Sequence, residues 1–244
     1  MNDLNFLKHQ TEAQRCYGCG VPFCQTGTVI DGKQFGCPLH NLIPEWNHML
    51  GNGNLQQAVS RLLQTNCFPE ITGRICPAFC QQVCLHKEVD TPVQTRANEL
   101  FLAEYAFEKG LIAPLIPTVY SDCTIAIIGA GPMGLAAAHY LSARGHTVTV
   151  YDKAAAPGGQ LLTNVSEKRL PRDILARRIA LLEAQGVEFR TNEEVDEESL
   201  KTFYDGVVNC THGQPRPSVA LAIAAGTKAA ADAEKALIGY TNLL

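Results

Sequence analysis

The sequence predicts a chain of two parts: a helical N-terminal domain with long loops, followed by an α/β domain of the doubly wound type. Eight of the ten cysteines fall within the first 120 residues. The apolar patterns of that half have helical periodicity. After residue 122 the order becomes strand, glycine-rich turn, helix and strand, which is typical of a doubly wound sheet. We therefore expect one domain at 1–120 and another at 121–244.

Two helices stand out in the first half. The first covers 54–64, with Asn54 in position to cap it and one apolar face, formed by Leu55, Val59, Leu62 and Leu63. The second covers 97–109 and stops at Gly110. No strand stands out before residue 120. We therefore expect a small helical domain whose long loops need something to hold them, with Trp46 in its core.

The second half is expected to begin with an extended connector at 110–122, which contains two prolines. After it, strands are predicted at 123–129, 146–152, 187–191 and 205–211. Helices are predicted at 132–145, 172–186 and 218–237. This alternation predicts a parallel sheet covered by helices.

Composition and charge exclude several classes of protein. The net charge is −4, so the basic patch of a nucleic-acid-binding protein is missing. The run "EEVDEE" at 193–198 is expected to be a solvated acidic face. The N-terminus has no apolar signal region, and no apolar run reaches the length of a membrane span. We therefore expect a cytoplasmic protein.

The cysteines are grouped as metal ligands usually are. The stretch "CYGCGVPFC" has the spacing C-x2-C-x4-C at Cys16, Cys19 and Cys24, and Cys37 follows in "GCPL". Clustered thiols in a reducing compartment favour metal over disulfides. A zinc site would need two C-x2-C pairs, and only one is present. Cys37 and Cys76 are each followed by proline. Cysteine followed by proline is typical of ferredoxin-like cluster sequences.

A second run, "CPAFCQQVC", places Cys76, Cys80 and Cys84 four residues apart. On a single helix Cys76 and Cys84 would be about 12 Å apart along the axis, too far to bind one small cluster. If this stretch is helical, these two cysteines must serve different centres, and Cys80 can join either. The remaining thiols, Cys67, Cys123 and Cys210, are expected to be ordinary buried cysteines. His40 is expected to be either a surface histidine or a residue that contacts the metal ligands without binding the metal itself.

The sequence "GAGPMG" matches G-x-G-x-x-G at Gly129, Gly131 and Gly134. The motif has the required context, because a predicted strand precedes it, a helix follows, and Asp152 ends the next strand. The glycines let the backbone approach a pyrophosphate, and the helix N-terminus stabilises its charge. Asp152 would bind the ribose hydroxyls and would disfavour a 2′-phosphate. A glycine turn without a ligand remains the alternative.

Longer stretches carry a specific resemblance over nearly the whole chain. They are "RCYGCGVPFC", "GCPLHNLIPEWN", "NCFPEITGRICPAFCQQVC", "GAGPMGLAAAHYL", "GHTVTVYDK" and "LLEAQGVEFRTN". These resemble the small subunit of glutamate synthase, an iron–sulfur flavoprotein. The same domain begins dihydropyrimidine dehydrogenase and the large subunit of bifurcating transhydrogenases.

The resemblance implies two [4Fe–4S] clusters in the helical domain. One would be bound by Cys16, Cys19, Cys24 and Cys84, and the other by Cys37, Cys76, Cys80 and Glu99. In this family the last ligand is a carboxylate or an amide shortly after a "P-V" dipeptide, and Glu99 holds that position in "TPVQTRANE". The alternative for Glu99 is a solvated residue on the predicted helix.

The resemblance also implies FAD in the Rossmann-like domain. The residues implied to bind it are Gly129, Gly131, Pro132, Met133, Gly134, Asp152, Lys153, Gly159, Gln160, Leu161, Val195, Thr211 and Gly213. The turn "PGGQL" would be the family's second flavin turn, and Thr211 and Gly213 belong to a degraded form of its Ala-Thr-Gly turn. One feature departs from the family. A second G-x-G-x-x-G is missing, as if the NADPH-binding domain had been excised.

These expectations lead to three functional hypotheses. The preferred one is an electron-transfer subunit, with no catalytic residue of its own, that relays electrons between FAD, the clusters and the partner subunits of an oxidoreductase complex, such as a dehydrogenase or hydrogenase. The second is an autonomous NAD(P)H-dependent flavin oxidoreductase. The third is a docking or assembly subunit that keeps its cofactors for structure.

Overall fold

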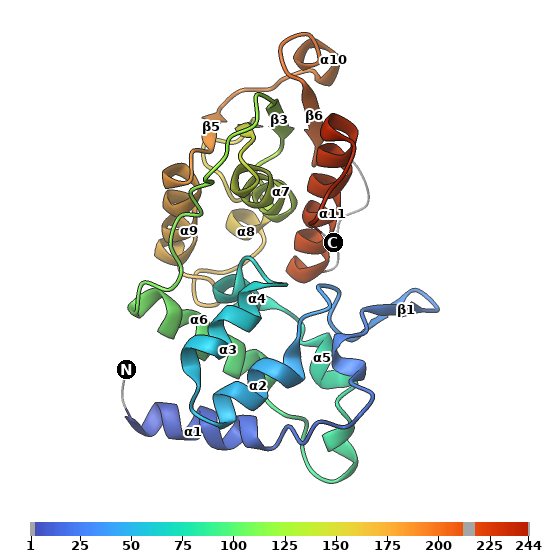
Figure 1. The fold of residues 1–244 in the computed structure, drawn as a ribbon, viewed down its shortest axis with the longest axis vertical. Helices are drawn as coiled ribbons and strands as arrows, with labels where there is room; N and C mark the ends of the chain where they lie inside the picture. Colours follow the sequence, from blue (N-terminus) through green and yellow to red (C-terminus); the bar gives the residue numbers. More distant parts are fainter. Residues whose placement is uncertain (1–2, 212–217, 244) are drawn as a thin grey trace. The chain divides into compact units, whose positions relative to one another are not determined.

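The computed structural model describes residues 3–211 and 218–243, which form two compact units, 1–113 and 114–244 (Figure 1). Unit 1 is helical and unit 2 is α/β, so the predicted fold class is confirmed. The boundary lies after Ala113, and the expected boundary at residue 120 falls within the segment without helix or strand that begins unit 2.

Unit 1 contains short helices joined by loops. Its α-helices are α1 (Asp3–Gln14), α2 (Ile43–Gly51), α3 (Leu55–Leu63), α4 (Pro69–Ile75), α5 (Phe79–Gln82) and α6 (Thr95–Glu108). The 3-10 helices are η1 (Phe23–Gln25) and η2 (Leu85–Glu88). The expectation of no strand in this half is wrong, because β1 (Thr28–Ile30) and β2 (Lys33–Phe35) form an antiparallel hairpin. The hairpin is mostly exposed, and its short strands carry no clear alternation of buried residues.

The core of unit 1 lies between α2, α3 and α6. Trp46 and Leu102 are fully buried there, as is Leu62 to within 1%. The predicted apolar face of α3 packs into this core, with Leu55 and Leu63 partly buried at its edge. Helix α6 ends where expected, since Gly110 has φ +67° and takes the left-handed conformation that follows many helices.

Unit 2 is built on a parallel sheet in the strand order β5-β4-β3-β6. The strands are β3 (Thr124–Ile128), β4 (Thr147–Asp152), β5 (Glu188–Thr191) and β6 (Gly206–Asn209). The helices are α7 (Pro132–Ala143), α8 (Gln160–Thr163), α9 (Arg172–Ala184), α10 (Glu197–Leu200) and α11 (Val219–Ile238). Strand β3 lies inside the sheet, between β4 and β6, and its Ile125 and Ile127 are fully buried.

The chain leaves β3 towards β4 on one side and returns to β6 on the other. In open parallel sheets this change of direction opens a crevice at the carboxyl ends of the strands, where ligands bind. Helix α11 packs closely against α7, because a Cβ on Gly226 would come within 2.2 Å of the Met133 carbonyl oxygen. The side chain of Ser218 caps α11 by accepting from the Leu221 N–H at 3.2 Å. Both contacts fix α11 beside the crevice.

Candidate functional site

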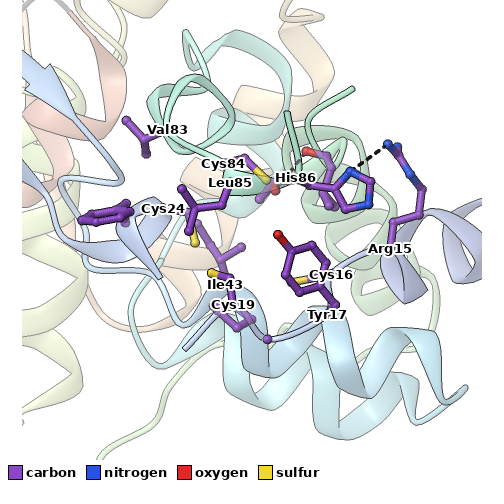
Figure 2. Close-up of a pocket in the computed structure, with 15 residues that line it drawn as sticks. Arg15, Cys16, Tyr17, Cys19, Cys24, Ile43, Val83, Cys84, Leu85 and His86 are labelled. Carbon is purple, nitrogen blue, oxygen red and sulfur yellow. Dashed lines mark hydrogen bonds between the residues drawn. The ribbon is translucent and has the colours of Figure 1, made fainter. Parts of the chain in front are cut away.

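Four cysteines of unit 1 line one pocket (Figure 2). Cys16 lies just after α1, Cys24 lies in η1 with Cys19 in the preceding loop, and Cys84 lies between α5 and η2. Figure 2 shows their sulfur atoms gathered around the same space, with Tyr17 and His86 at its edge. These are the same four residues that the family resemblance implies as ligands of one cluster.

The electrostatics of this pocket show that the thiols act on one another. The pKa of Cys24 is raised to about 12, mainly by burial and also by the neighbouring Cys16, Cys19 and Cys84. The pKa of Cys16 is also raised, first by burial and then by Cys84 and Cys19, against a hydrogen bond from the backbone at Gly18. Thiolates are therefore disfavoured here unless a cation is bound, because several negative charges would share one partly buried space.

A second group forms deeper in unit 1, from Cys37, Cys76, Cys80 and Glu99. Cys37 follows the hairpin, Cys76 ends α4, Cys80 lies on α5 and Glu99 on α6. Burial raises the pKa of Cys37 to about 12, and Glu99 and Cys76 add to this rise. Burial also raises the pKa of Cys76 to about 11, with a further contribution from Glu99.

Cys80 belongs to the second group and is also influenced by the first. Burial raises its pKa well above the usual range, and the charges of Cys37, Glu99, Cys76 and Cys24 raise it further. Three of these belong to the second group, so Cys80 lies with that group, and the influence of Cys24 reflects the proximity of the first.

The run from 76 to 84 is not one helix. Cys76 has extended backbone, Ala78 has φ +58°, and only 79–82 are helical. The separation expected for Cys76 and Cys84 on a single helix therefore does not apply, because the stretch is not helical throughout. The structure nevertheless separates the two end cysteines, since Cys84 lines the first pocket and Cys76 lies with the deeper group. The left-handed turn redirects the chain between them.

Glu99 is a buried residue, only 8% exposed, so the solvated alternative is wrong. Burial raises the pKa of its carboxyl group to about 7, against a hydrogen bond from Thr72 that lowers it. Its Oε1 accepts from the Thr72 hydroxyl at 2.5 Å and its Oε2 from the Asn41 amide at 3.3 Å. Spacing in the sequence did not reveal Asn41 or Thr72, because both approach Glu99 from distant parts of the chain.

Among the described residues, no three His, Cys, Asp or Glu side chains are arranged to hold a single metal ion. A cubane cluster spreads four ligands over a wider shell than one ion does. Of the other cysteines, Cys67 is buried as expected, whereas Cys123 and Cys210 are only partly buried. His40 is exposed and its Nδ1 lies 3.2 Å from the Gln25 carbonyl oxygen, which agrees with a surface histidine.

The glycine turn of unit 2 has the expected geometry. Gly129 has φ +100°, and a Cβ on Gly134 would lie 1.9 Å from the Gly129 carbonyl oxygen, so the helix can begin here only with glycine. Gly131 differs, because among the described residues no atom lies within 4 Å of a Cβ placed there. The open space at Gly131 lies beside the N-terminus of α7, which begins with Pro132 and Met133.

Asp152 lies at the end of β4 and is tied to this turn. Its Oδ2 accepts from the Ala130 N–H at 2.6 Å and its Oδ1 from the Ala154 N–H at 2.8 Å. The Gly158 N–H donates to the Ala130 carbonyl oxygen at 2.8 Å, and a Cβ on Gly159 would meet the Gly131 Cα at 2.9 Å. The second glycine turn therefore packs directly on the first.

The remaining predicted residues of unit 2 have different surroundings. Gln160 and Leu161 begin α8, where Gln160 is exposed and Leu161 buried. Lys153 is exposed, and Val195 packs against the small core beneath β4. Thr211 lies close to the turn, since a Cβ on Gly129 would meet its Cγ2 at 2.9 Å. Gly213 lies outside the described residues.

No helix in the described part of the chain has both the length and the apolar character needed to cross a membrane.

Comparison with known proteins identifies both units. Residues 2–111 match the family model for domain II of dihydropyrimidine dehydrogenase with its 4Fe-4S cluster. Residues 127–186 match the model for an NAD(P)-binding Rossmann-like domain. The first unit is thus similar to an iron–sulfur domain and the second to a dinucleotide-binding domain.

Two curated relatives illustrate the likeness over most of the chain. The glutamate synthase (NADPH) small chain of Bacillus subtilis is 42% identical over 207 residues, which cover 83% of this chain and 42% of that protein. The glutamate synthase (NADH) of Saccharomyces cerevisiae is 40% identical over 205 residues, covering 82% of this chain and 9% of that protein. The chain therefore spans less than half the length of these relatives.

A solved structure, that of histamine dehydrogenase from Rhizobium sp. 4-9, matches 41% of this chain and 15% of its own chain. The two are 26% identical with a TM-score of 0.32. At that TM-score the likeness supports no argument about this protein.

Proposed function

We propose that this chain, a relative of the glutamate synthase small chains built from an iron–sulfur domain and a Rossmann-like domain, is an electron-transfer subunit of an oxidoreductase complex. Its cofactors would be two [4Fe–4S] clusters and FAD. The observation that carries the proposal is the gathering of seven cysteines and one buried carboxylate into two groups of four.

The donor chemistry of both groups fits iron–sulfur clusters. Cys16, Cys19, Cys24 and Cys84 would hold one cluster. Cys37, Cys76, Cys80 and Glu99 would hold the other, and hydrogen bonds to the carboxylate would contribute to its potential. Burial, and to a lesser extent the neighbouring negative groups, raise the pKa values of these thiols, and ligation by iron would favour the thiolate form against both effects.

The geometry of unit 2 supports FAD as the dinucleotide. Gly131 leaves open space beside the N-terminus of α7, where a pyrophosphate would receive backbone N–H groups. Asp152 stands at the end of β4, the position that binds ribose hydroxyls. The second turn at Gly158 and Gly159 packs against this loop and would extend the site along a longer cofactor. Gln160 and Leu161 follow directly on the second turn, and Thr211 lies close to Gly129. Lys153 and Val195 would make further contacts with the cofactor.

When bound, FAD and the clusters supply conversion between two-electron and one-electron transfer. The protein's own part is to bind and orient them. The thiols and Glu99 hold the clusters within one helical unit, and the two glycine turns hold the dinucleotide. The partner subunits would supply the primary substrate site and the second electron carrier, as expected for a chain that contains one dinucleotide motif.

A second candidate is an autonomous NAD(P)H-dependent oxidoreductase. The match of 127–186 to an NAD(P)-binding model is the observation that favours it. In this case the dinucleotide turn would bind the nicotinamide cofactor itself, and the chain would be active without a partner.

Anaerobic purification of the full chain separates the two candidates. The proposed function requires about eight irons with matching acid-labile sulfide, bound FAD, and a flavin that stays oxidised when NADPH or NADH is added. Rapid bleaching of the flavin at one equivalent of reduced nicotinamide, with steady turnover of an artificial acceptor, would establish the second candidate instead. A chain with four irons or fewer at full occupancy, or with zinc, would refute the cluster assignment.

A further inference from the structure

The carboxylate of Glu99 is held from two sides by uncharged side chains that come from different parts of unit 1. Thr72 of α4 donates to Oε1 at 2.5 Å, and Asn41, in the loop before α2, donates to Oε2 at 3.3 Å. Glu99, Thr72 and Asn41 are all buried. A buried carboxylate with a donor on each oxygen is fixed in one orientation, because rotation would break both bonds.

Each of these donors is itself fixed by further buried groups. The Asn41 oxygen accepts from the Trp46 ring N–H at 3.0 Å and from the Thr65 hydroxyl at 3.1 Å. These two bonds identify which end of the Asn41 amide is oxygen, so its NH2 group must point to Glu99. The orientation of the amide is therefore determined by the core of unit 1 and not by Glu99.

The hydroxyl of Thr72 is oriented in a similar way. It accepts from the Asn66 amide at 2.7 Å, and its single proton has a choice of acceptors. The distance to Glu99 is 2.5 Å, whereas the distance to the Phe68 carbonyl oxygen is 3.2 Å. The shorter contact to a carboxylate is the stronger bond, so the proton is directed to Glu99.

We propose that Asn41 and Thr72 are positioning residues that hold the Glu99 carboxylate toward Cys37, Cys76 and Cys80 and set the potential of the cluster bound there. This inference rests on the proposed function, since it presupposes that Glu99 is a ligand. A hydrogen bond to a ligand oxygen withdraws electron density from the metal, so both donors would raise the potential of the cluster that Glu99 would hold.

The experiment uses the full chain, purified with its clusters under anaerobic conditions. Thr72→Val removes the hydroxyl and keeps the shape of the side chain, and Thr72→Ser keeps the hydroxyl. Thr149→Val is a matched control, because Thr149 is a buried threonine of β4 in unit 2. Asn41→Asp keeps the oxygen that Trp46 and Thr65 contact but removes the donor to Glu99. The readouts are the midpoint potential and the EPR spectrum of each cluster.

We expect Thr72→Val and Asn41→Asp to lower the potential of one cluster and change its EPR signal, while the other cluster keeps the potential of the wild type. Thr72→Ser and Thr149→Val should match the wild type in both clusters. Equal changes in both clusters, or a Thr72→Ser variant that behaves like Thr72→Val, would mean that Thr72 acts only through the fold. If Thr72→Val does not fold, as judged by circular dichroism, Asn41→Asp and Thr72→Ser decide the question.

Glu99→Ala distinguishes failure of this inference from failure of the proposed function. If Glu99→Ala changes one cluster but the Thr72 and Asn41 variants change neither, Glu99 remains a ligand and the positioning role is refuted. If Glu99→Ala leaves both clusters as in the wild type, the ligand assignment is refuted and the positioning role with it.

Discussion

The peptide N–H of Cys37 donates a 2.7 Å hydrogen bond to the carbonyl oxygen of Cys24. A single backbone hydrogen bond thus links a residue of one four-residue group to a residue of the other group. Cys80 of the deeper group also lies within the electrostatic influence of Cys24. Two clusters bound at these groups would be close neighbours with a short route for an electron between them.

This contact predicts magnetic interaction between the two clusters. When both are reduced, the EPR spectrum of the chain should be broadened or split by spin coupling, because the ligands Cys24 and Cys37 are linked directly. A Cys84→Ser variant, which should keep only the deeper cluster, should give a simple uncoupled signal. The prediction fails if the fully reduced spectrum equals the sum of two single-cluster spectra.

The division into two groups predicts how iron is lost. Cys84→Ser and Cys80→Ser should each remove or severely destabilise one cluster, leaving about four irons, because each removes a ligand from a different group. Cys67→Ser is the control, since Cys67 is buried outside both groups. Metal analysis and EPR should show that the two variants retain different clusters. Loss of the same cluster in both variants would contradict the division.

The glycine turn allows ligand binding and folding to be tested separately. Gly131→Ala should fold with the stability of the wild type, because its Cβ would meet no atom of the part of the chain that the structure describes within 4 Å. It should bind FAD about tenfold more weakly or worse if a pyrophosphate occupies that space. Gly134→Ala should instead destabilise the chain by about 3 kcal/mol or more, because its Cβ would collide with a backbone carbonyl. Flavin titration and urea denaturation measure the two effects. Unchanged FAD affinity in Gly131→Ala would place the dinucleotide elsewhere.

Acid should destabilise unit 2 through His139 on α7. The pKa of this ring is lowered to about 3, mainly by burial and also by the charge of Arg178. The pKa in the folded state is below that in the unfolded state, so the unfolded state binds the proton first as the pH falls below about 6.5. Between pH 7 and pH 5 this group should reduce the free energy of unfolding by about 2 kcal/mol.

The His139→Gln variant isolates this effect. Its free energy of unfolding should change less between pH 7 and pH 5 than that of the wild type, as measured by urea denaturation at both pH values. His48→Gln is the control, because the His48 side chain is on the surface of unit 1. Equal slopes in wild type and His139→Gln would exclude His139 as the cause.

Much of unit 2 could be predicted from the sequence, because its signals are local. The motif at Gly129, Gly131 and Gly134 lies between a buried strand and an apolar helix, and the strands β3 and β4 lie within a residue of their predicted ranges at each end. The helix α3 was equally clear, since its apolar residues lie on one face. Such features depend on residues close together in the chain.

Unit 1 was harder to predict where contacts join distant residues. The burial of Glu99 depends on Asn41 and Thr72, which are 58 and 27 residues away in the sequence. Helix α1 has no clean apolar face, as Leu4 and Leu7 are exposed, so periodicity gives no signal for it. The grouping of the cysteines came from resemblance to a family, because spacing alone left Cys80 free to join either group.

The contact of Gly226 with the Met133 carbonyl oxygen has an evolutionary consequence. It sets how closely α11 approaches α7, and the Ser218 cap starts the helix locally. Any side chain at position 226 would have to push α11 away from α7, so lineages that keep this helix pair in close packing should keep glycine there.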